Sequence, residues 1–138
     1  MVNRVIEEKL ESLRRCLQRV SDKCPGDAAT LTRDLDAQDI VALNLTRAVQ
    51  ICVDIAAHLI AELNEPPPNT MGEAFDGLAR EEIITPELAT RMKRAVGFRN
   101  IAVHNYEAIN WEIVFAICQK HLVDFRQFAA ACADRLID

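Results

Sequence analysis

Hydrophobic residues recur every three or four positions through the first twenty residues of the chain. They follow one narrow stripe of a helix, with charged side chains on the other faces. The stripe is formed by Val2, Ile6, Leu10, Leu13, Leu17 and Val20. This pattern predicts an amphipathic helix, which ends at Pro25-Gly26 because proline cannot continue a helix. A polar stretch follows as far as Asp36.

A second, broader apolar run extends from about Gln38 to Leu63. Its hydrophobic residues cover too much of the helix circumference for a surface helix, so the run predicts the central and most buried helix of the fold. Three consecutive prolines, Pro66–Pro68, come shortly after it. Because proline supplies no backbone donor and clashes with helical geometry, these residues end the helix.

Capping signals predict three more helices in the second half of the chain. Thr70 and Glu73 have the spacing of a capping box, which opens a short helix that extends to about Glu82. The sequence Thr85–Glu87 provides a hydroxyl cap, a proline at the first helical position and an acid near the positive helix end. Asn110 caps a final helix. The predicted fold is an all-α, up-and-down bundle of four main helices plus one short helix.

Composition agrees with this prediction and excludes other classes. The chain has 138 residues, of which 50% are hydrophobic, so a single domain over residues 1–138 has ample material for a core. Four glycines and five prolines are too few for a disordered chain or for an all-β protein with frequent turns. The net charge of −5 argues against a protein that coats nucleic acid non-specifically.

The cysteines and the absence of export signals indicate a reducing compartment. The five cysteines are odd in number, form no C-x-x-C pair, and have no histidine at zinc-ligand spacing, so we expect reduced, mostly apolar side chains. The N-terminus lacks the apolar core of a signal peptide, and no uncharged stretch of membrane-spanning length occurs. We therefore expect a soluble cytoplasmic protein that does not bind membranes.

One segment between the last two predicted helices, Gly97–Tyr106, concentrates candidate catalytic groups. It holds Arg99, His104 and the only tyrosine of the chain. Imidazole can transfer a proton near neutral pH, and guanidinium can hold two phosphate oxygens, so these groups suit phosphodiester chemistry. A structural alternative stays open, in which Arg and His contact the last helix carbonyls and the tyrosine packs. No acid interrupts the basic residues of this region, which are Arg91, Lys93, Arg94 and Arg99.

A line of polar side chains on the central helix is the second candidate. Its members are Asn44, Arg47, Asp54 and His58. Buried polar groups need partners, and the stripe has two interpretations. Either Asp54 bonds His58 one turn away while Arg47 pairs elsewhere, or the stripe lines the same cleft as the Gly97–Tyr106 segment. Two potential ligands do not make a metal site, so no metal is expected.

The segment Arg99–Tyr106 resembles the R-x4-H-x-Y motif of HEPN-domain ribonucleases. The similarity is to the HepT toxins, which are encoded beside an MNT-type nucleotidyltransferase antitoxin, MntA. It includes Asn100, since the family has a polar residue directly after the motif arginine. The resemblance extends over most of the chain, through residues 43–47, 52–59, 88–106 and 122–125.

The resemblance implies a metal-independent endoribonuclease toxin that acts as a homodimer, needs no cofactor and cleaves RNA. Arg99 and His104 would be catalytic, Asn100 would be a supporting polar group, and the antitoxin would modify Tyr106 with AMP. One Arg and one His provide little for acid and base together, so a site composed from two subunits fits the chemistry. The rival hypothesis is a non-catalytic HEPN bundle that acts as a helical adaptor or as a nucleotide-binding partner of a nucleotidyltransferase.

Overall fold

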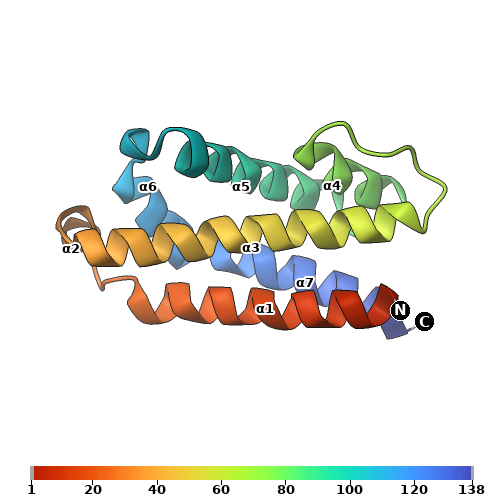
Figure 1. Cartoon of the computed structure of the whole chain (residues 1–138), viewed down its shortest axis with the longest axis horizontal. Helices are drawn as coiled ribbons and strands as arrows, with labels where there is room; N and C mark the ends of the chain where they lie inside the picture. Colours follow the sequence, from red (N-terminus) through yellow and green to blue (C-terminus); the bar gives the residue numbers. More distant parts are fainter. Residues whose placement is uncertain (1, 138) are drawn as a thin grey trace.

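Two long antiparallel helices form one side of the molecule. The computed structural model describes residues 2–137; helix α1 spans Val2–Lys23 and helix α3 spans Leu35–Ala61. They lie side by side and run in opposite directions (Figure 1). The side chain of Val2 lies outside the described residues, but the rest of the predicted stripe faces the core. Its fully buried members are Ile6, Leu13, Leu17 and Val20.

A short helix that the sequence did not predict, α2 (Ala28–Arg33), connects α1 and α3. The side chain of Asp27 caps it by accepting a hydrogen bond from the backbone N–H of Thr30 at 2.7 Å. Asp34 then caps α3 through the N–H of Ala37 at 3.0 Å. Because Asp34 provides this cap, α3 begins three residues before the predicted start at Gln38.

Helix α3 contributes many buried residues to the core and is the central helix of the bundle, as predicted. By length and composition it is apolar enough to cross a membrane, and among the described residues it is the one helix of that kind. However, 56% of the most apolar 18-residue stretch of this helix is buried inside the bundle. Helices α1, α4, α5 and α7 all pack against it, so its hydrophobic residues are accounted for by the core of a folded domain.

The predicted caps open the next two helices at the expected residues. Helix α4 spans Met71–Arg80 and helix α5 spans Pro86–His104. The hydroxyl of Thr70 accepts from the N–H of Glu73 at 3.3 Å, and that of Thr85 accepts from the third residue of α5 at 3.1 Å. The proline run lies in the loop between α3 and α4 (Figure 1). Helix α5 thus runs antiparallel to α3 and ends beside its first turns.

The last part of the chain is helical without interruption from Trp111 to Ile137, with a local change of pitch. The 3-10 turn η1 (Tyr106–Ala108) precedes α6 (Trp111–Ala116), the π-helical turn η2 (Ile117–His121) and α7 (Leu122–Ile137). The side chain of Asn110 caps α6, as predicted. The π turn was not predicted; such turns insert one extra residue per turn and often occur near functional sites.

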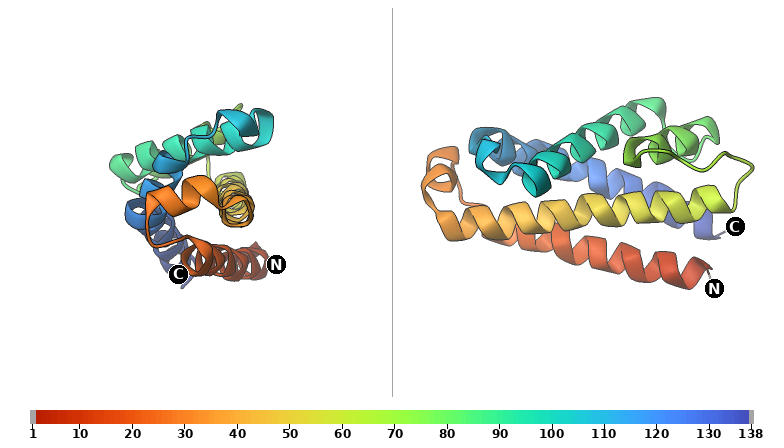
Figure 2. Two further views of the ribbon diagram at one scale, coloured as in Figure 1. Left: turned by 90° about the vertical axis from the view of Figure 1, so that its left-hand side faces the viewer. Right: turned by 45° about the horizontal axis from the view of Figure 1, so that its top comes forward.

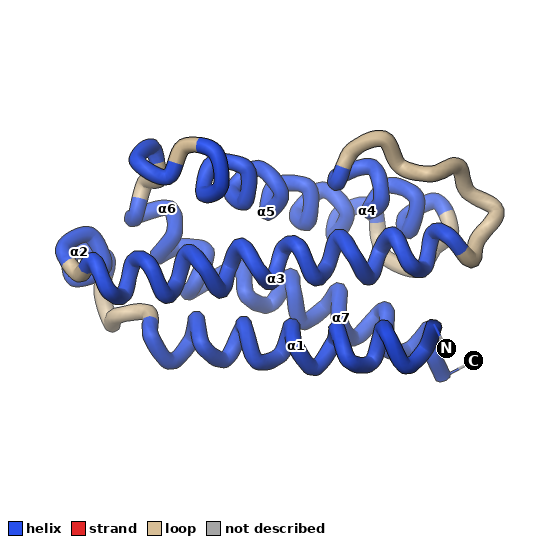
Figure 3. The backbone as a smooth tube through the Cα atoms, viewed as in Figure 1, coloured by secondary structure: helices blue, strands red, loops and turns tan. Residues whose placement is uncertain are grey.

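The arrangement confirms the predicted all-α bundle. Seen end-on, α1, α3, α5 and α7 occupy four separate positions around the core (Figure 2). Residues 2–137 contain helices and loops without a strand (Figure 3). An edge-to-face pair, Phe75 and Phe128 at 5.5 Å between ring centres, joins α4 to α7. All five cysteines are free thiols, and three of them, Cys16, Cys52 and Cys132, are buried.

Candidate active site

Most of the candidate motif, from Arg99 to His104, belongs to the last turns of α5, and Tyr106 opens the 3-10 turn η1 that follows. Residues 97–104 are helical, and α5 ends at His104; the N–H of the next residue, Asn105, donates to the carbonyl of Ile101 at 2.8 Å. The placement of residues 97–104 between the last two helices was wrong, because this stretch contains no helix breaker other than one glycine. A helical motif fixes the directions of its side chains: Arg99 and His104 leave the helix about 140° apart and about 7.5 Å apart along its axis.

Asn100 lies between Arg99 and His104 around the helix and binds the arginine side chain. Nη1 of Arg99 donates a hydrogen bond to Oδ1 of Asn100 at 3.1 Å, and Asn100 lies about 40° from His104 around the helix. The guanidinium is therefore held on the side of α5 that carries His104. Nε of Arg99 is buried and makes no hydrogen bond to any described residue. A buried donor of this kind calls for an explanation, and a ligand oxygen is one.

His104 and Tyr106 follow at the exposed end of the helix. His104 occupies the last position of α5, and Tyr106 opens η1 with 38% of its surface exposed. The tyrosine ring packs edge-to-face with Trp111 at 5.7 Å between ring centres. Its hydroxyl donates a hydrogen bond to Oδ1 of Asp39 on α3 at 2.6 Å. Burial and the Asp39 carboxylate together raise the pKa of Tyr106 well above its usual value.

Asp39 is a residue of the site that the sequence did not predict. It lies 67 residues from Tyr106 along the chain, on an exposed face of α3, and no local motif marks it. The antiparallel packing of α3 and α5 brings the two together.

The predicted positive region is smaller than expected, because two of its four cations have acidic partners on neighbouring helices. Lys93 forms an ion pair with Asp76 of α4 at 3.1 Å. Arg91 forms one with Asp124 of α7 at 2.9 Å. Arg94 and Arg99 have no carboxylate partner among the described residues.

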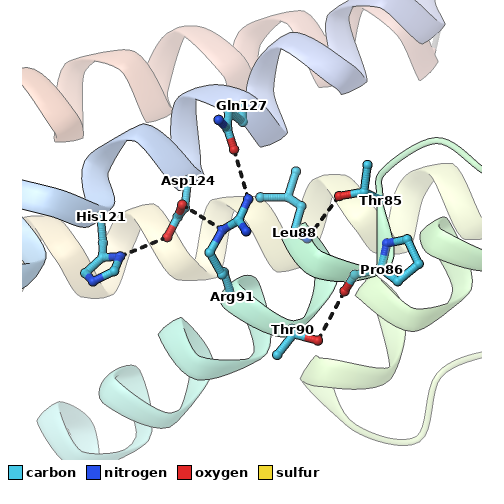
Figure 4. A network of polar contacts seen from close by, with 8 residues as sticks. All are labelled: Thr85, Pro86, Leu88, Thr90, Arg91, His121, Asp124 and Gln127. Carbon is cyan, nitrogen blue, oxygen red and sulfur yellow. Dashed lines mark hydrogen bonds and ion pairs between the residues drawn. The ribbon is translucent and has the colours of Figure 1, made fainter.

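The ion pair of Arg91 belongs to a network that fastens α5 to the end of the π turn (Figure 4). Nη2 of Arg91 donates to Oε1 of Gln127 at 3.1 Å, and Oδ2 of Asp124 lies 3.3 Å from Nδ1 of His121. Asp124 is buried, so these contacts satisfy an otherwise costly charge. The network holds the helix that carries the motif at a fixed position on α7.

The polar stripe of α3 does not join this site within one chain. Asp54 accepts from Gln50 at 3.0 Å and pairs with Lys9 of α1 at 3.6 Å, so the predicted bond from Asp54 to His58 is absent. Asp54 and His58 lie about 22 and 28 Å beyond Asp39 along the helix axis. The sequence left two interpretations for the stripe, a bond from Asp54 to His58 or a place in the cleft. Instead, Asp54 has its charged partner on α1.

The first half of that stripe is closer to the site but is turned toward its own helix or toward α1. The buried amide of Asn44 donates to the carbonyl of Ile40 at 2.8 Å. The charge of Arg47 lies near enough to Cys16 of α1 to oppose the burial that raises the pKa of that thiol.

An apolar cavity of about 510 Å³ lies beside α5 and is bounded by α3, α6, η2 and α7. Two residues at its border are exposed hydrophobics, Ile101 (46%) and Ile113 (58%). Gly97 and Arg94 line it as well. Among the described residues, no group of three or more His, Cys, Asp or Glu side chains has the geometry to hold a metal ion.

Comparison with known proteins agrees with this architecture. The family model described as ribonuclease HepT-like matches residues 4–132. The mRNA nuclease HepT of Shewanella oneidensis is 38% identical over 127 residues, which are 92% of this chain and 95% of that protein. The tRNA nuclease HepT of Aphanizomenon flos-aquae is 31% identical over 111 residues, 80% of this chain and 76% of that protein.

Solved structures are similar over the same extent. The tri-AMPylated HEPN toxin of Shewanella oneidensis, in complex with MNT antitoxin, matches with a TM-score of 0.88 and 36% identity, covering 94% of this chain and 97% of that one. The cytosolic protein YutE of Bacillus subtilis matches with a TM-score of 0.81 at 14% identity over 95% of this chain and 87% of that one, which shows a shared fold alone.

The fold and these similarities define the class of the protein: an all-α endoribonuclease with the architecture of HEPN toxins. Within that class, the chain belongs to the HepT-like ribonuclease family. The family and the nuclease relatives support an endoribonuclease rather than a non-catalytic helical adaptor.

Proposed function

We propose that this protein is the toxin of a HEPN/MNT toxin–antitoxin pair, and that it cleaves RNA without a metal through Arg99 and His104. The observation that carries the proposal is the state of Arg99. Its guanidinium has no carboxylate partner, and Asn100 holds it on the side of α5 that carries His104. Such a cation is available to bind a phosphate.

The chemistry that these groups support is attack by a ribose 2′-OH on its own phosphate. His104 takes the proton of the hydroxyl while the O–P bond forms, and Arg99 stabilises the negative charge that builds on the phosphorane. The bond to the 5′ oxygen then breaks, and a second acid must supply a proton to that oxygen. This mechanism requires RNA, because DNA lacks the 2′-OH.

His104 of a second subunit is the natural source of that acid. Arg94, Gly97, Ile101 and His104 follow one face of α5 at steps of three, four and three residues. Glycine inside an exposed helix is less stable than alanine by about 1 kcal/mol, and a Cβ on Gly97 would meet no atom within 4 Å. A glycine with open space in its own chain suits close contact with another helix. We therefore propose a two-fold dimer across this face, with Ile101 beside its axis.

The partner and the control of the toxin follow from its relatives. The Shewanella toxin was solved AMPylated and in complex with MNT antitoxin. By extension, the cognate nucleotidyltransferase would bind this chain and attach AMP to Tyr106, its only tyrosine. A phosphodiester placed there would add negative charge next to the end of α5 and compete with RNA for Arg99.

The test is RNA cleavage by Arg99→Ala and His104→Ala, measured with EDTA present. Loss of the proton-transfer group lowers the rate by about 10²–10⁴-fold, and loss of the charge-stabilising group lowers it by about 10²–10³-fold. Arg126→Ala removes an exposed arginine of α7 and serves as the matched control with unchanged cleavage. Undiminished cleavage by either site variant, or wild-type activity that disappears with EDTA, would refute the mechanism.

A further inference from the structure

We propose that Asp39 is the catalytic base of the modification of Tyr106, accepting the phenolic proton as the hydroxyl attacks a nucleoside triphosphate. The assignment rests on the proposed function, since it requires that Tyr106 is the site of AMP transfer. It concerns a residue of the toxin itself, on a different helix from the R-x4-H-x-Y motif.

The geometry of the contact suits proton transfer. The Tyr106 hydroxyl donates to Oδ1 of Asp39 at 2.6 Å, within the range of a charge-assisted O–H···O⁻ bond. The ring is fixed from a second direction by Trp111, which meets it edge-to-face at an angle of 63°. Two contacts from two helices therefore define where the nucleophilic oxygen lies, before any partner is bound.

Both side chains remain accessible to a partner. Tyr106 keeps 38% of its surface exposed, and Asp39 is exposed on α3. No cation among the described residues forms an ion pair with Asp39. The carboxylate is thus committed to the tyrosine, and its charge is not neutralised by a neighbour.

The reaction needs a base at this position because the attacking group is a neutral phenol. Free tyrosine ionises at about pH 10, and the Asp39 contact raises the pKa of Tyr106 further, so little phenolate exists beforehand. As the bond from the phenolic oxygen to the α-phosphorus forms, that oxygen becomes far more acidic, and its proton passes to Asp39. The bond between the α-phosphorus and the bridging oxygen breaks, and pyrophosphate leaves.

The experiment compares initial rates of AMP incorporation by intact mass, with the cognate MNT-type nucleotidyltransferase, ATP and Mg²⁺. Asp39→Asn keeps an oxygen that can accept the hydrogen bond but cannot take the proton. We expect a rate about 10²–10⁴-fold lower near pH 7. Asp36→Asn removes another exposed carboxylate one turn earlier in α3 and is expected to react like the wild type. A rate for Asp39→Asn close to that of the wild type would overturn the assignment.

The pH dependence separates proton transfer from mere positioning. If Asp39 takes the proton, the ratio of wild-type to Asp39→Asn rates falls as pH rises toward the phenol pKa, because hydroxide replaces the missing base. Taking the ratio cancels the pH dependence of the nucleotidyltransferase. A ratio that stays constant with pH would mean that the aspartate only orients the ring, and would overturn its role as base. Helical circular dichroism of each variant checks that the fold is intact.

Failure of the proposed function gives a different result. In that case the wild-type protein gains no AMP mass, or Tyr106→Phe gains as much as the wild type. If the wild type is modified on Tyr106 and Asp39→Asn is modified equally fast, only the role of Asp39 is refuted.

Discussion

Arg91→Met should destabilise the protein much more than Lys93→Met, although both changes remove one cation from the same helix. Arg91 meets a buried carboxylate: its side chain is 34% exposed and that of Asp124 only 12%. It also donates to Gln127. Lys93 pairs with Asp76 where the two side chains are 45% and 38% exposed. The two substitutions therefore test whether burial sets the strength of these contacts.

The magnitudes follow from what each substitution leaves behind. Without Arg91, Asp124 keeps only its 3.3 Å contact with His121. A buried charged acceptor that loses its main partner destabilises the fold by about 2 kcal/mol. An exposed pair contributes about 0–1 kcal/mol. For a chain of 138 residues, these values correspond to a fall in Tm of about 7 °C for Arg91→Met and of at most about 3.5 °C for Lys93→Met.

The assay is thermal unfolding followed by circular dichroism at one fixed protein concentration, because the proposed dimerisation would make Tm concentration-dependent. The double variant Arg91→Met, Asp124→Leu should recover most of the loss, since removing both partners leaves no buried charge. Equal shifts for the two single variants would refute the reasoning. So would a double variant that is no more stable than Arg91→Met alone.

Two further predictions use the special positions of Gly97 and Tyr106. Gly97→Leu should leave the monomer folded, because an added Cβ has no neighbour within 4 Å. It should shift the molecular mass measured by light scattering from twice 15.5 kDa toward 15.5 kDa; a stable Gly97→Leu dimer would show that the interface lies elsewhere. The single tyrosine can be titrated by ultraviolet absorbance, and its midpoint should lie above the usual value of about 10 and fall in Asp39→Asn. An unchanged titration midpoint in Asp39→Asn would contradict the prediction that Asp39 raises the pKa of Tyr106. Since the pKa of Tyr106 is raised in the folded state, the stabilisation from this contact is complete below about pH 10 and is lost as pH rises through the folded pKa.

The starts of three capped helices, α4, α5 and α6, could be predicted from the sequence almost to the residue. Thr70, Thr85 and Asn110 each bond a backbone N–H within three positions, so the signal and its effect lie in the same short segment. The helix α2 was missed because Asp27 and Asp34 stand in a polar stretch without a long apolar stripe. The π turn was missed because no local pattern in residues 117–121 marks it.

For the candidate site, too, only the features that are local in the sequence could be predicted. The motif residues could be found because they lie within eight positions of one another, and the helical spacing then fixes Asn100 between Arg99 and His104. The neutralisation of Arg91 and Lys93 could not be foreseen, because their partners, Asp124 and Asp76, come from other helices. A count of charges along one segment overestimates the positive field whenever neighbouring elements supply acids.

Asp39 is the extreme case, because nothing near it in the sequence distinguishes it from Asp34 or Asp36. What sets it apart is that α5 runs antiparallel to α3 and ends beside the first turns of α3. The break at Asn105 then turns the chain so that Tyr106 meets the exposed face of α3. A shift of one residue in the register of α3 would rotate Asp39 by about 100° and remove the contact. The geometry that links the tyrosine to a carboxylate is therefore a property of helix packing, and it is absent from the motif that identifies the tyrosine.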